Sequence, residues 1–365
     1  MSQPRCILIA AGGTGGHLFP AQALAIALAG RGLAVELATD ERALRFGQDF
    51  PARAIHRIPS ATPTGAGPAS KARAALVLAR GVALSWMRIR KIAPLAVIGF
   101  GGYPTVPPVL AAALLKLPTL LHEQNAVMGR ANRFLAPRVR IIATGFPTLK
   151  GAQGSLAAKM RYTGNPVRPA VLAAAATPYP EFVNGRLRVL ITGGSQGARV
   201  MSDVAPAAIA LLSEADRTRV SVTQQARAED KQSVAAACAR MNFPVELAEF
   251  FGDLPARIAA SHLIIGRAGA STVSELAVIG RPSILVPFPH ALDQDQAANA
   301  AILADCGAAQ VVPQAEFTPE RLAGLLRKAL ADPASLIAAA RAARAAGAPD
   351  AAERLADLVE ECAGR

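Results

Sequence analysis

A short apolar run that leads through a glycine-rich loop into a helical stretch occurs twice in this chain. The first run, at 5–11, precedes GGTGGH at 12–17, and the second, at 188–192, precedes GGSQGA at 193–198. The first helical stretch is expected to open at Pro20. The two glycine loops start at positions 12 and 193 of a chain of 365 residues, so they lie about half the chain apart. At roughly 150 residues per domain, this spacing predicts two domains that each begin with a strand, a loop and a helix.

Further apolar runs of strand length alternate with helical stretches. They lie at 34–39, 95–99, 119–122 and 140–143 in the first half, and at 220–224, 245–248, 263–266, 283–287 and 309–312 in the second. Such alternation is typical of parallel sheets covered by helices on both faces. The sequence therefore predicts an α/β protein of two Rossmann-like domains, joined near 163–169, where two prolines favour an extended chain. Ligands are expected beyond the carboxyl ends of the strands, and the alanine-rich tail at 318–362 is expected to be helical throughout.

The positive charge is concentrated in the first half of the chain. The formal net charge is +13; residues 1–170 contain 21 Lys/Arg and 5 Asp/Glu, whereas residues 171–365 contain 18 and 21. The first half is therefore suited to an anionic partner, which is nucleic acid, an acidic substrate or a membrane surface. Aromatic residues make up only 4% of the chain, which disfavours nucleic acid because stacking on bases requires them. A hydrophobic fraction of 52% excludes a disordered protein.

The segment 71–91 combines basic and apolar residues. It reads KARAALVLARGVALSWMRIRK, with six basic residues, no acidic residue and the only Trp of the chain, Trp86. As a helix it would carry an apolar stripe edged by cations, which is the pattern of a helix lying on an anionic membrane surface. An ordinary amphipathic helix packed on a sheet has the same pattern, and Gly81 weakens a helix of either kind. Both interpretations stay open from these residues alone.

Several classes of protein are not indicated. No apolar run reaches the roughly 18 residues of a membrane-spanning helix, because Lys116 and Pro118 interrupt the longest one. The residues before the first glycine loop do not resemble a signal peptide. The four cysteines lie far apart with no CxxC pair, so reduced thiols are expected rather than a disulfide framework or a zinc site.

The glycine loops are candidate anion sites, because free N–H groups and the helix dipole at the start of a helix face the ligand. Neither matches a stronger fingerprint. The first has Leu18 where a dinucleotide-binding loop has its third glycine, and the second lacks the ending of a P-loop. Asp40 follows the strand at 34–39, where a dinucleotide ribose would need a carboxylate. Binding of NAD therefore stays open as an alternative.

Two further segments carry polar groups suited to a nucleotide sugar. GRAGASTVSE at 266–275 follows an apolar strand and opens a helix, and its small residues suit a phosphate. Glu275 could accept hydrogen bonds from both hydroxyls of a ribose, or could simply complement the helix dipole. DQDQAAN at 293–299 could bind the hydroxyls of a sugar, or could begin an exposed helix.

Taken together, these motifs resemble one family of glycosyltransferases. The motifs are GGTGGH at 12–17, GFGGYP at 99–104, HEQN at 122–125, TGNPVR at 163–168, GGSQGA at 193–198, GRAGASTVSE at 266–275 and DxxQxxN at 293–299. In this order and spacing they are similar to the MurG family, which adds N-acetylglucosamine (GlcNAc) to lipid I in peptidoglycan synthesis. The resemblance implies a GT-B fold, in which two Rossmann-like domains with parallel sheets face each other across a cleft.

The resemblance also implies a division of labour. Residues 1–165 are expected to form a domain that binds the lipid-linked acceptor and faces the membrane, and residues 166–345 a domain that binds UDP-GlcNAc. Residues 346–365 are expected to form a helix that packs back towards the first domain. The uneven charge agrees with this division, and it favours contact of the segment 71–91 with the anionic inner membrane, on whose cytoplasmic face the protein would be peripheral. Other proteins of cell-wall synthesis are further candidate partners, and nucleic acid is not.

Most of the motif residues are assigned by the resemblance to substrate binding. From the second domain these are Ser195, Gln196, Phe251, Ala270, Ser271, Thr272, Val273, Ser274, Glu275, Gln296 and Asn299. From the first domain and the linker they are Thr14, Gly15, Gly16, Tyr103, Asn125 and Arg168. Ser195 and its neighbouring amides would contact the diphosphate together with Arg168, and Glu275 would hold the ribose. The backbone of Phe251 would read the uracil, and Gln296 the GlcNAc hydroxyls.

The implied reaction is attack of the C4 hydroxyl of MurNAc on the anomeric carbon of GlcNAc, with inversion and loss of UDP. His17, at the end of the first glycine loop, is the expected general base, because imidazole accepts protons near neutral pH. It could instead only bond its own loop. Glu123 is the rival base or a partner, since it is the only acidic residue between Asp49 and Glu181. Amides, helix dipoles and Arg168 can stabilise the departing UDP, so no metal is required in the site, although a divalent cation could stimulate the enzyme.

Other nucleotide-sugar enzymes of the GT-B fold remain the alternative. A UDP-GlcNAc 2-epimerase or a glycolipid glycosyltransferase would keep a nucleotide-sugar pocket but need not carry HEQN or GGTGGH at these positions. Ser202 and Asp295 depart from the pattern of many members of the family, and both lie beside the expected donor pocket.

Overall fold

The computed structural model describes residues 6–13, 15–41, 50–62, 67–194, 197–291 and 294–364. The chain divides into two compact units. The first unit comprises residues 1–168 together with 348–365, and the second comprises residues 169–347.

The first unit is built on a seven-stranded sheet of order β3-β2-β1-β4-β5-β6-β7, in which every pairing is parallel. The strands are β1 (Cys6–Ala10), β2 (Ala34–Thr39), β3 (Ala54–Arg57), β4 (Ala96–Gly99), β5 (Thr119–Glu123), β6 (Ile141–Thr144) and β7 (Met160–Tyr162). The sequence did not reveal β3 and β7. Both are short, partly exposed edge strands, so they lack the continuous apolar pattern of buried ones.

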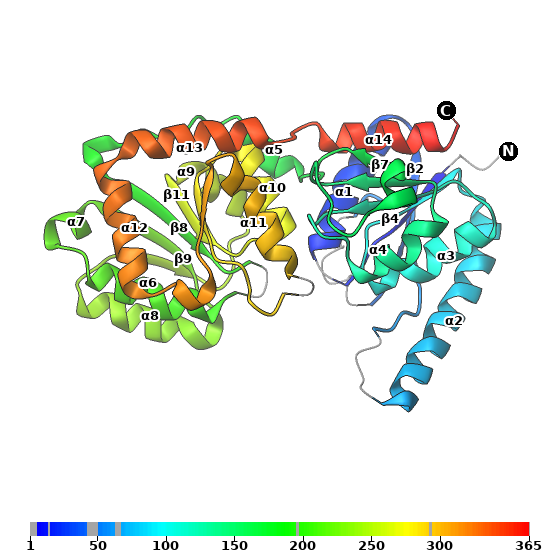
Figure 1. Cartoon of the computed structure of the whole chain (residues 1–365), viewed down its shortest axis with the longest axis horizontal. Helices are drawn as coiled ribbons and strands as arrows, with labels where there is room; N and C mark the ends of the chain where they lie inside the picture. Colours follow the sequence, from blue (N-terminus) through cyan, green and yellow to red (C-terminus); the bar gives the residue numbers. More distant parts are fainter. Residues whose placement is uncertain are drawn as a thin grey trace. The chain divides into compact units, whose positions relative to one another are not determined.

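Helices cover both faces of this sheet (Figure 1). They are α1 (Gly15–Gly30) and α14 (Ala351–Cys362) on one face, and α2 (Pro68–Ile92), α3 (Val106–Leu114) and α4 (Arg130–Leu135) on the other. Alternate residues of β1 divide between the two cores: Ile7 and Ile9 pack with α1 and α14, and Leu8 packs with the opposite layer. This two-sided burial explains why the neighbouring strands β1 and β4 are apolar at every position.

The second unit has a six-stranded, fully parallel sheet of order β10-β9-β8-β11-β12-β13. Its strands are β8 (Leu187–Thr192), β9 (Val220–Gln225), β10 (Val245–Ala248), β11 (Leu263–Gly266), β12 (Ser283–Leu285) and β13 (Ala309–Val311). Its helices are α5 (Pro169–Ala175), α6 (Arg199–Ala210), α7 (Glu214–Thr218), α8 (Ala228–Arg240), α9 (Leu254–Ala260), α10 (Ala270–Ile279), α11 (Asp295–Asp305), α12 (Pro319–Ala331) and α13 (Pro333–Ala346). The prediction of two Rossmann-like domains with parallel sheets is confirmed, as is the helical tail.

Short 3-10 helices complete the two units. They are η2 (Tyr103–Thr105), η3 (Ala136–Arg138) and η4 (Gly154–Lys159) in the first, and η5 (Val183–Gly185) and η7 (Gln314–Glu316) in the second.

Helix α1 begins earlier than its sequence suggests. Pro20 was expected to open the helix, but α1 starts at Gly15 and Pro20 lies inside it. His17 therefore sits in the first turn of the helix rather than at the end of a loop. A side chain on a helix turn has fewer orientations than one on a glycine loop, so the direction of the His17 imidazole is better defined.

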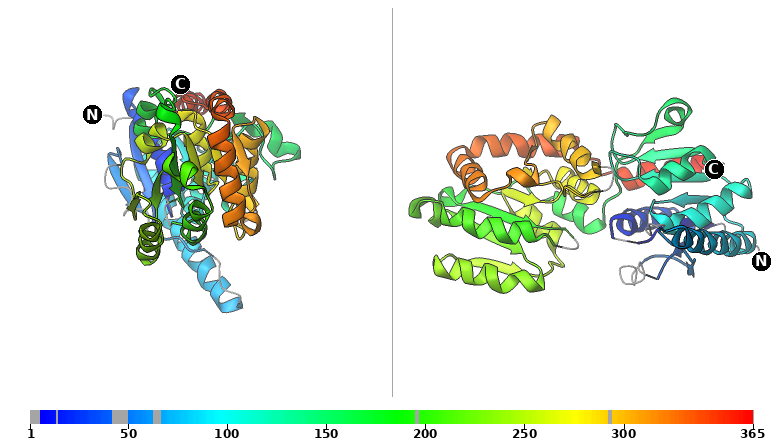
Figure 2. Two further views of the ribbon diagram at one scale, coloured as in Figure 1. Left: turned by 90° about the vertical axis from the view of Figure 1, so that its left-hand side faces the viewer. Right: turned by 60° about the horizontal axis from the view of Figure 1, so that its bottom comes forward.

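Helix α2 is continuous through Gly81, the residue expected to weaken it. Gly81 is buried, and a Cβ at this position would collide with the backbone oxygen of Pro59 and press on Pro107. The glycine therefore permits close packing of the helix on the rest of the unit. The left view of Figure 2 shows that α2, in light blue, extends well beyond the other helices of the first unit.

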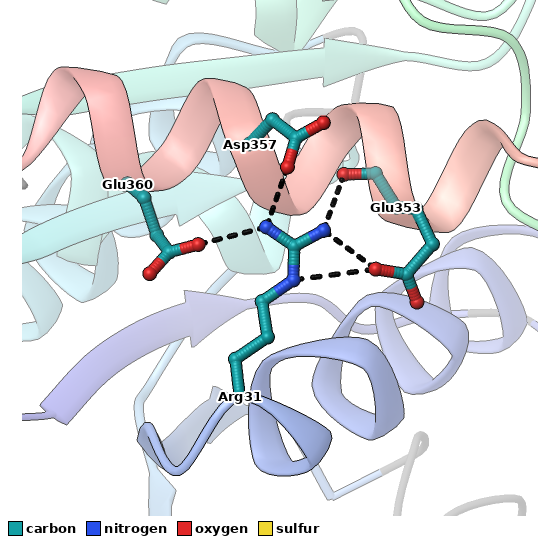
Figure 3. Close-up of polar contacts among 4 residues, drawn as sticks. All are labelled: Arg31, Glu353, Asp357 and Glu360. Atoms are coloured by element: carbon teal, nitrogen blue, oxygen red, sulfur yellow. Dashed lines mark hydrogen bonds and ion pairs between the residues drawn. The ribbon is translucent and has the colours of Figure 1, made fainter.

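Arg31 binds three carboxylates along the C-terminal helix α14 (Figure 3). Arg31, just after α1, approaches carboxylate oxygens of Glu353 at 2.5 Å, Asp357 at 2.6 Å and Glu360 at 2.7 Å. These carboxylates recur every three or four residues, so they lie along one face of the helix. The opposite face, which includes the fully buried Leu355, packs into the core beside α1.

Replacing Arg31 with Met is expected to loosen α14 without unfolding the sheet. Two of the three carboxylates are largely exposed, so the network contributes about 1–2 kcal/mol rather than the sum of three buried pairs. Amide hydrogen exchange in peptides from α14 should accelerate by about 5- to 30-fold, while peptides from α13 keep their rates.

The matched control is Arg354→Met, which removes one exposed pair with Asp350 at the start of the same helix. It should change exchange in α14 by less than about twofold. Equal exchange rates in the two variants would mean that Arg31 does not hold the helix.

Candidate active site

Polar residues converge at the carboxyl edge of the first sheet. His17 follows β1, Gly102 follows β4 and Gln124 follows β5, and these three strands are neighbours in the sheet. The Nδ1 atom of His17 lies 3.0 Å from Oε1 of Gln124. A Cβ on Gly102 would lie 3.3 Å from Cδ2 of His17, so the backbone here packs against the imidazole ring. The edge where ligands bind in parallel sheets therefore carries a partly buried, well-supported histidine.

The first glycine loop is held by Asp40. The backbone N–H of Gly13 donates to Oδ1 of this carboxylate at 3.0 Å, and Asp40 is buried directly after β2. A Cβ on Gly12 would lie 2.9 Å from the same oxygen, which explains why the loop needs glycine there. Asp40 was considered as a ribose ligand for NAD, whereas here its carboxylate supports the loop.

Glu123 binds the loop that follows β5. Its Oε1 accepts the N–H of Asn125 at 3.0 Å, and its Oε2 accepts the N–H of Gly129 at 2.9 Å and the side-chain amide of Asn132 at 2.8 Å. The carboxylate is almost fully buried. Both of its oxygens are therefore occupied in shaping the segment from Asn125 to the start of α4.

The other expected residues of the first unit lie near this edge. Gly15 is buried at the start of α1 against the ring of Phe19, and Gly16 is exposed beside it. Tyr103 is half-buried at the start of η2. The guanidinium of Arg168 stacks over Phe19 at 4.4 Å from the ring centre, which brings the linker arginine close to the N-terminal end of α1. Thr14 lies outside the described residues.

In the second unit, Gln225 organises the glycine loop after β8. Its Oε1 accepts from the hydroxyl of Thr192 at 2.8 Å and from the N–H of Gly193 at 3.2 Å, and its Nε2 donates to the backbone oxygen of Gly194 at 3.0 Å. Gln225 is the last residue of β9, the strand next to β8. Ser195 and Gln196, the expected diphosphate ligands in this loop, lie outside the described residues.

The third loop leads into α10 as the sequence indicated. Gly269 is the residue before the first turn, and Ser271 and Thr272 are half-buried in that turn. Ala270, Val273, Ser274 and Glu275 are buried. The side chain of Val273 is completely buried, so only its backbone could contact a ligand. Phe251, after β10, is nearly buried under the guanidinium of Arg257, 4.3 Å from the ring centre.

Gln296 and Asn299 tie two loops of this unit together from α11. Oε1 of Gln296 accepts from the N–H of Phe288 at 3.0 Å and of Ala268 at 3.3 Å. Asn299 is fully buried and donates to the backbone oxygen of Ala268 at 3.2 Å. These residues therefore hold the ends of β11 and β12 in one arrangement. Both of these bonds to Gln296 use its amide oxygen, and neither uses its amide nitrogen.

Sequence reasoning did not single out Gln124 and Gln225. Both are buried glutamines at the carboxyl end of a strand, where an apolar run has just ended. That position is a usable signal, because a polar side chain there faces the ligand-binding edge of a parallel sheet. The loop that each amide contacts depends on the strand order, so the local sequence does not reveal it.

Comparison with known proteins identifies the family. The glycosyltransferase family 28 N-terminal domain matches residues 7–144, and the glycosyltransferase family 28 C-terminal domain matches residues 188–355. The chain belongs to glycosyltransferase family 28. Each match begins on the strand that precedes one of the two glycine loops, so the repeated pattern marks the two domains of this family.

Full-length relatives within family 28 narrow the assignment. The UDP-N-acetylglucosamine--N-acetylmuramyl-(pentapeptide) pyrophosphoryl-undecaprenol N-acetylglucosamine transferase of Methylobacterium radiotolerans is 57% identical over 361 residues, which cover 98% of each chain. The crystal structure of MurG from Acinetobacter baumannii matches with a TM-score of 0.80 and 29% identity, covering 98% of this chain and 100% of that one. The resemblance to the MurG family is confirmed. The calicheamicin glycosyltransferase CalG4 has a TM-score of 0.69 at 16% identity over nearly all of both chains, which shows the shared fold alone.

Proposed function

We propose that this family 28 enzyme transfers GlcNAc from UDP-GlcNAc to the C4 hydroxyl of MurNAc in undecaprenyl-diphospho-MurNAc-pentapeptide (lipid I), giving lipid II. The observation that carries the proposal is the 57% identity, over 98% of both chains, to a transferase named for this donor and acceptor. The glycine loops, the buried strand-end side chains and His17 supply the groups that such a transfer requires.

UDP-GlcNAc binds to the second unit in this proposal. The loop at 193–198 and the first turn of α10 offer backbone N–H groups to the diphosphate, and the dipole of α10 adds to their attraction. Gln225 holds the first of these loops with a neutral amide, which does not repel an anion. Glu275 takes the ribose hydroxyls, and Gln296 uses its amide nitrogen for the sugar.

His17 is the general base in this proposal. Its imidazole takes the proton as the O–H bond of the acceptor hydroxyl breaks, while the oxygen forms a bond to the anomeric carbon. The bond from that carbon to the diphosphate breaks at the same time, and its electron pair leaves with UDP. Backbone amides and Arg168 stabilise the charge that develops on the leaving group. Glu123, with both oxygens engaged in its own loop, positions Asn125 rather than taking the proton.

Incubation with UDP-GlcNAc and a short-chain lipid I analogue should yield a GlcNAc-extended product and UDP in equal amounts. Transfer of radiolabelled GlcNAc and release of UDP are measured in parallel. UDP release or epimerisation without any transfer to this acceptor would contradict the proposal in favour of another nucleotide-sugar enzyme. Binding of NADH in place of UDP would favour a dinucleotide site at the first glycine loop. Binding of RNA would favour nucleic acid as the partner of the basic first half.

The substitution His17→Ala tests the chemical step. Loss of a general base lowers kcat by about 10²- to 10⁴-fold, because only water remains to take the proton. Binding of UDP, measured by calorimetry, should stay within about twofold, since the imidazole contributes to the transition state rather than to the nucleotide. An unchanged kcat would remove His17 as the base.

Replacing Glu275 with Ala is expected to raise the KM for UDP-GlcNAc by about 10- to 100-fold, because two hydrogen bonds from the ribose to a carboxylate are lost. Glu320→Ala is the matched control. Glu320 lies in the first turn of α12 in the same unit, so it tests the general effect of removing a carboxylate near a helix start. A KM for Glu275→Ala equal to that of the control would exclude the ribose role.

We further propose that α2 docks the enzyme on an anionic lipid surface. Leu76 is 72% exposed and Met87 57%, and basic residues flank them along the helix. Trp86 and Met87 of α2 and Leu110 of α3 contribute to an apolar groove of about 570 Å³. No helix in the described part of the chain combines the length and apolar character needed to cross a bilayer. Apolar side chains would enter the interface while cations meet lipid phosphates.

Trp86, the only Trp of the chain, reports this docking without a label. Its fluorescence should shift to shorter wavelength with vesicles that contain phosphatidylglycerol but not with pure phosphatidylcholine. The double substitution Leu76→Ser and Met87→Ser should weaken binding by about tenfold or more. Val183→Ser with Leu211→Ser, at exposed apolar positions of the second unit, should not. Equal binding by both double variants would contradict docking through α2.

A further inference from the structure

A chain of side-chain hydrogen bonds runs from the first turn of α1 into the buried end of β5. Nδ1 of His17 lies 3.0 Å from Oε1 of Gln124, and Nε2 of Gln124 lies 3.0 Å from Nδ1 of His122. Nε2 of His122 in turn lies 3.1 Å from the backbone oxygen of Gly164. All four residues belong to the first unit.

Two backbone carbonyls fix the direction of every bond in this chain. Nε2 of Gln124 also lies 3.0 Å from the backbone oxygen of His122. A carbonyl can only accept, so the NH₂ group of the amide must face it and the amide oxygen must face His17. The backbone oxygen of Gly164 likewise requires a proton on Nε2 of His122, whose Nδ1 then accepts from Gln124.

Burial keeps His122 in this neutral form. The side chain is completely buried, and this burial lowers the pKa of His122 to about 4, against the smaller opposing effect of the hydrogen bond to Gly164. The nearby imidazole of His17 makes a smaller contribution to the same lowering of the pKa. A second proton on His122 would point its Nδ1–H at the NH₂ group of Gln124, donor against donor. Gln124 is itself nearly buried, and its backbone oxygen accepts from Asn165 at 2.9 Å.

The ring of His17 is also confined from the side of β4. Gly101 and Gly102 both have positive φ, at 84° and 73°. A Cβ on Gly102 would lie 3.4 Å from Nε2 of His17, and a Cβ on Gly101 would lie 3.4 Å from Cε1. The two glycines therefore let the backbone pack against the imidazole, and the ring is held between this backbone and Gln124.

We propose that Gln124 is a positioning residue that holds His17 in the Nδ1–H tautomer, so that Nε2 carries the lone pair that takes the proton of the acceptor hydroxyl. The amide can only accept from His17, so a proton must stay on Nδ1 throughout the step. Nε2 gains a proton in the transfer and loses it to water afterwards. This inference rests on the proposed role of His17 as the general base.

The tautomer can be read without any assay of activity. In protein labelled with ¹⁵N-histidine, NMR at pH 8 should show His17 with its proton on Nδ1, the less common form in water. The chain has five histidines, and the signal of His17 is assigned by its loss in His17→Gln. Gln124→Met, which keeps the length of the side chain but removes the amide, should shift His17 towards the Nε2–H form. Retention of the Nδ1–H form in Gln124→Met would overturn the proposal.

Kinetics supply the second readout. Gln124→Met should lower kcat by about 10- to 100-fold and leave the KM for UDP-GlcNAc within about twofold. The double variant His17→Ala with Gln124→Met should be no slower than His17→Ala alone, because Gln124 acts through His17. Multiplying effects would show that Gln124 acts elsewhere, and would overturn its positioning role.

Two controls separate the positioning role of Gln124 from the role of His17 as the general base. Gln153→Met makes the same substitution at an exposed position of the first unit and should keep wild-type kcat and tautomer. If wild-type protein shows the Nδ1–H form and Gln124→Met loses it, but His17→Ala retains full transfer, the geometry stands and the assignment of His17 as base fails. If the tautomer does not respond to Gln124, the positioning role fails whatever the activity.

Discussion

Each repeated glycine loop in this enzyme depends on the polar side chain at the end of the next strand. The glycines of these loops have no side chains that could accept a hydrogen bond, and their buried N–H groups need partners. Asp40, directly after β2, accepts from Gly13, and Gln225, at the end of β9, accepts from Gly193. Since β2 lies beside β1 and β9 beside β8, the two units solve this problem at the same place in the same topology. The internal repeat therefore extends from the glycine loops to the residues that support them.

Most of the carboxylates contributed by residues 1–170 lie inside the first unit. Of the five acidic residues in 1–170, Glu36, Asp40 and Glu123 are buried. Glu36 accepts from Arg53 and from His56, which hold the pKa of its carboxyl below the usual range despite its burial. These carboxylates serve the sheet edge and the loops, so few acids remain to offset the cations of α2.

The alternation of apolar runs with helical stretches predicted the architecture well, because the central strands are buried on both faces and appear as apolar runs in the sequence. The same logic could not reveal β3 and β7, whose residues are only partly buried or exposed. It also misjudged Pro20 and Gly81, each taken as a local signal. Pro20 lies inside α1, and Gly81 lets α2 approach Pro59 and Pro107, so tertiary packing overrides the helix propensity of both residues.

The sequence by itself determined the two parallel-sheet domains, the family, the basic first half and the motifs that carry the proposed site. The domains and the basic half follow from periodicity, spacing and composition, and the family follows from the resemblance of its ordered motifs; all of these are properties of the local sequence. Only the tertiary structure decided how His17 meets Gln124, which is 107 positions away, and which way their hydrogen bonds run. That direction is set by the carbonyls of His122 and Gly164, and a backbone carbonyl has the same identity at every position of a sequence. Its effect appears only when folding brings it against a side chain that must donate.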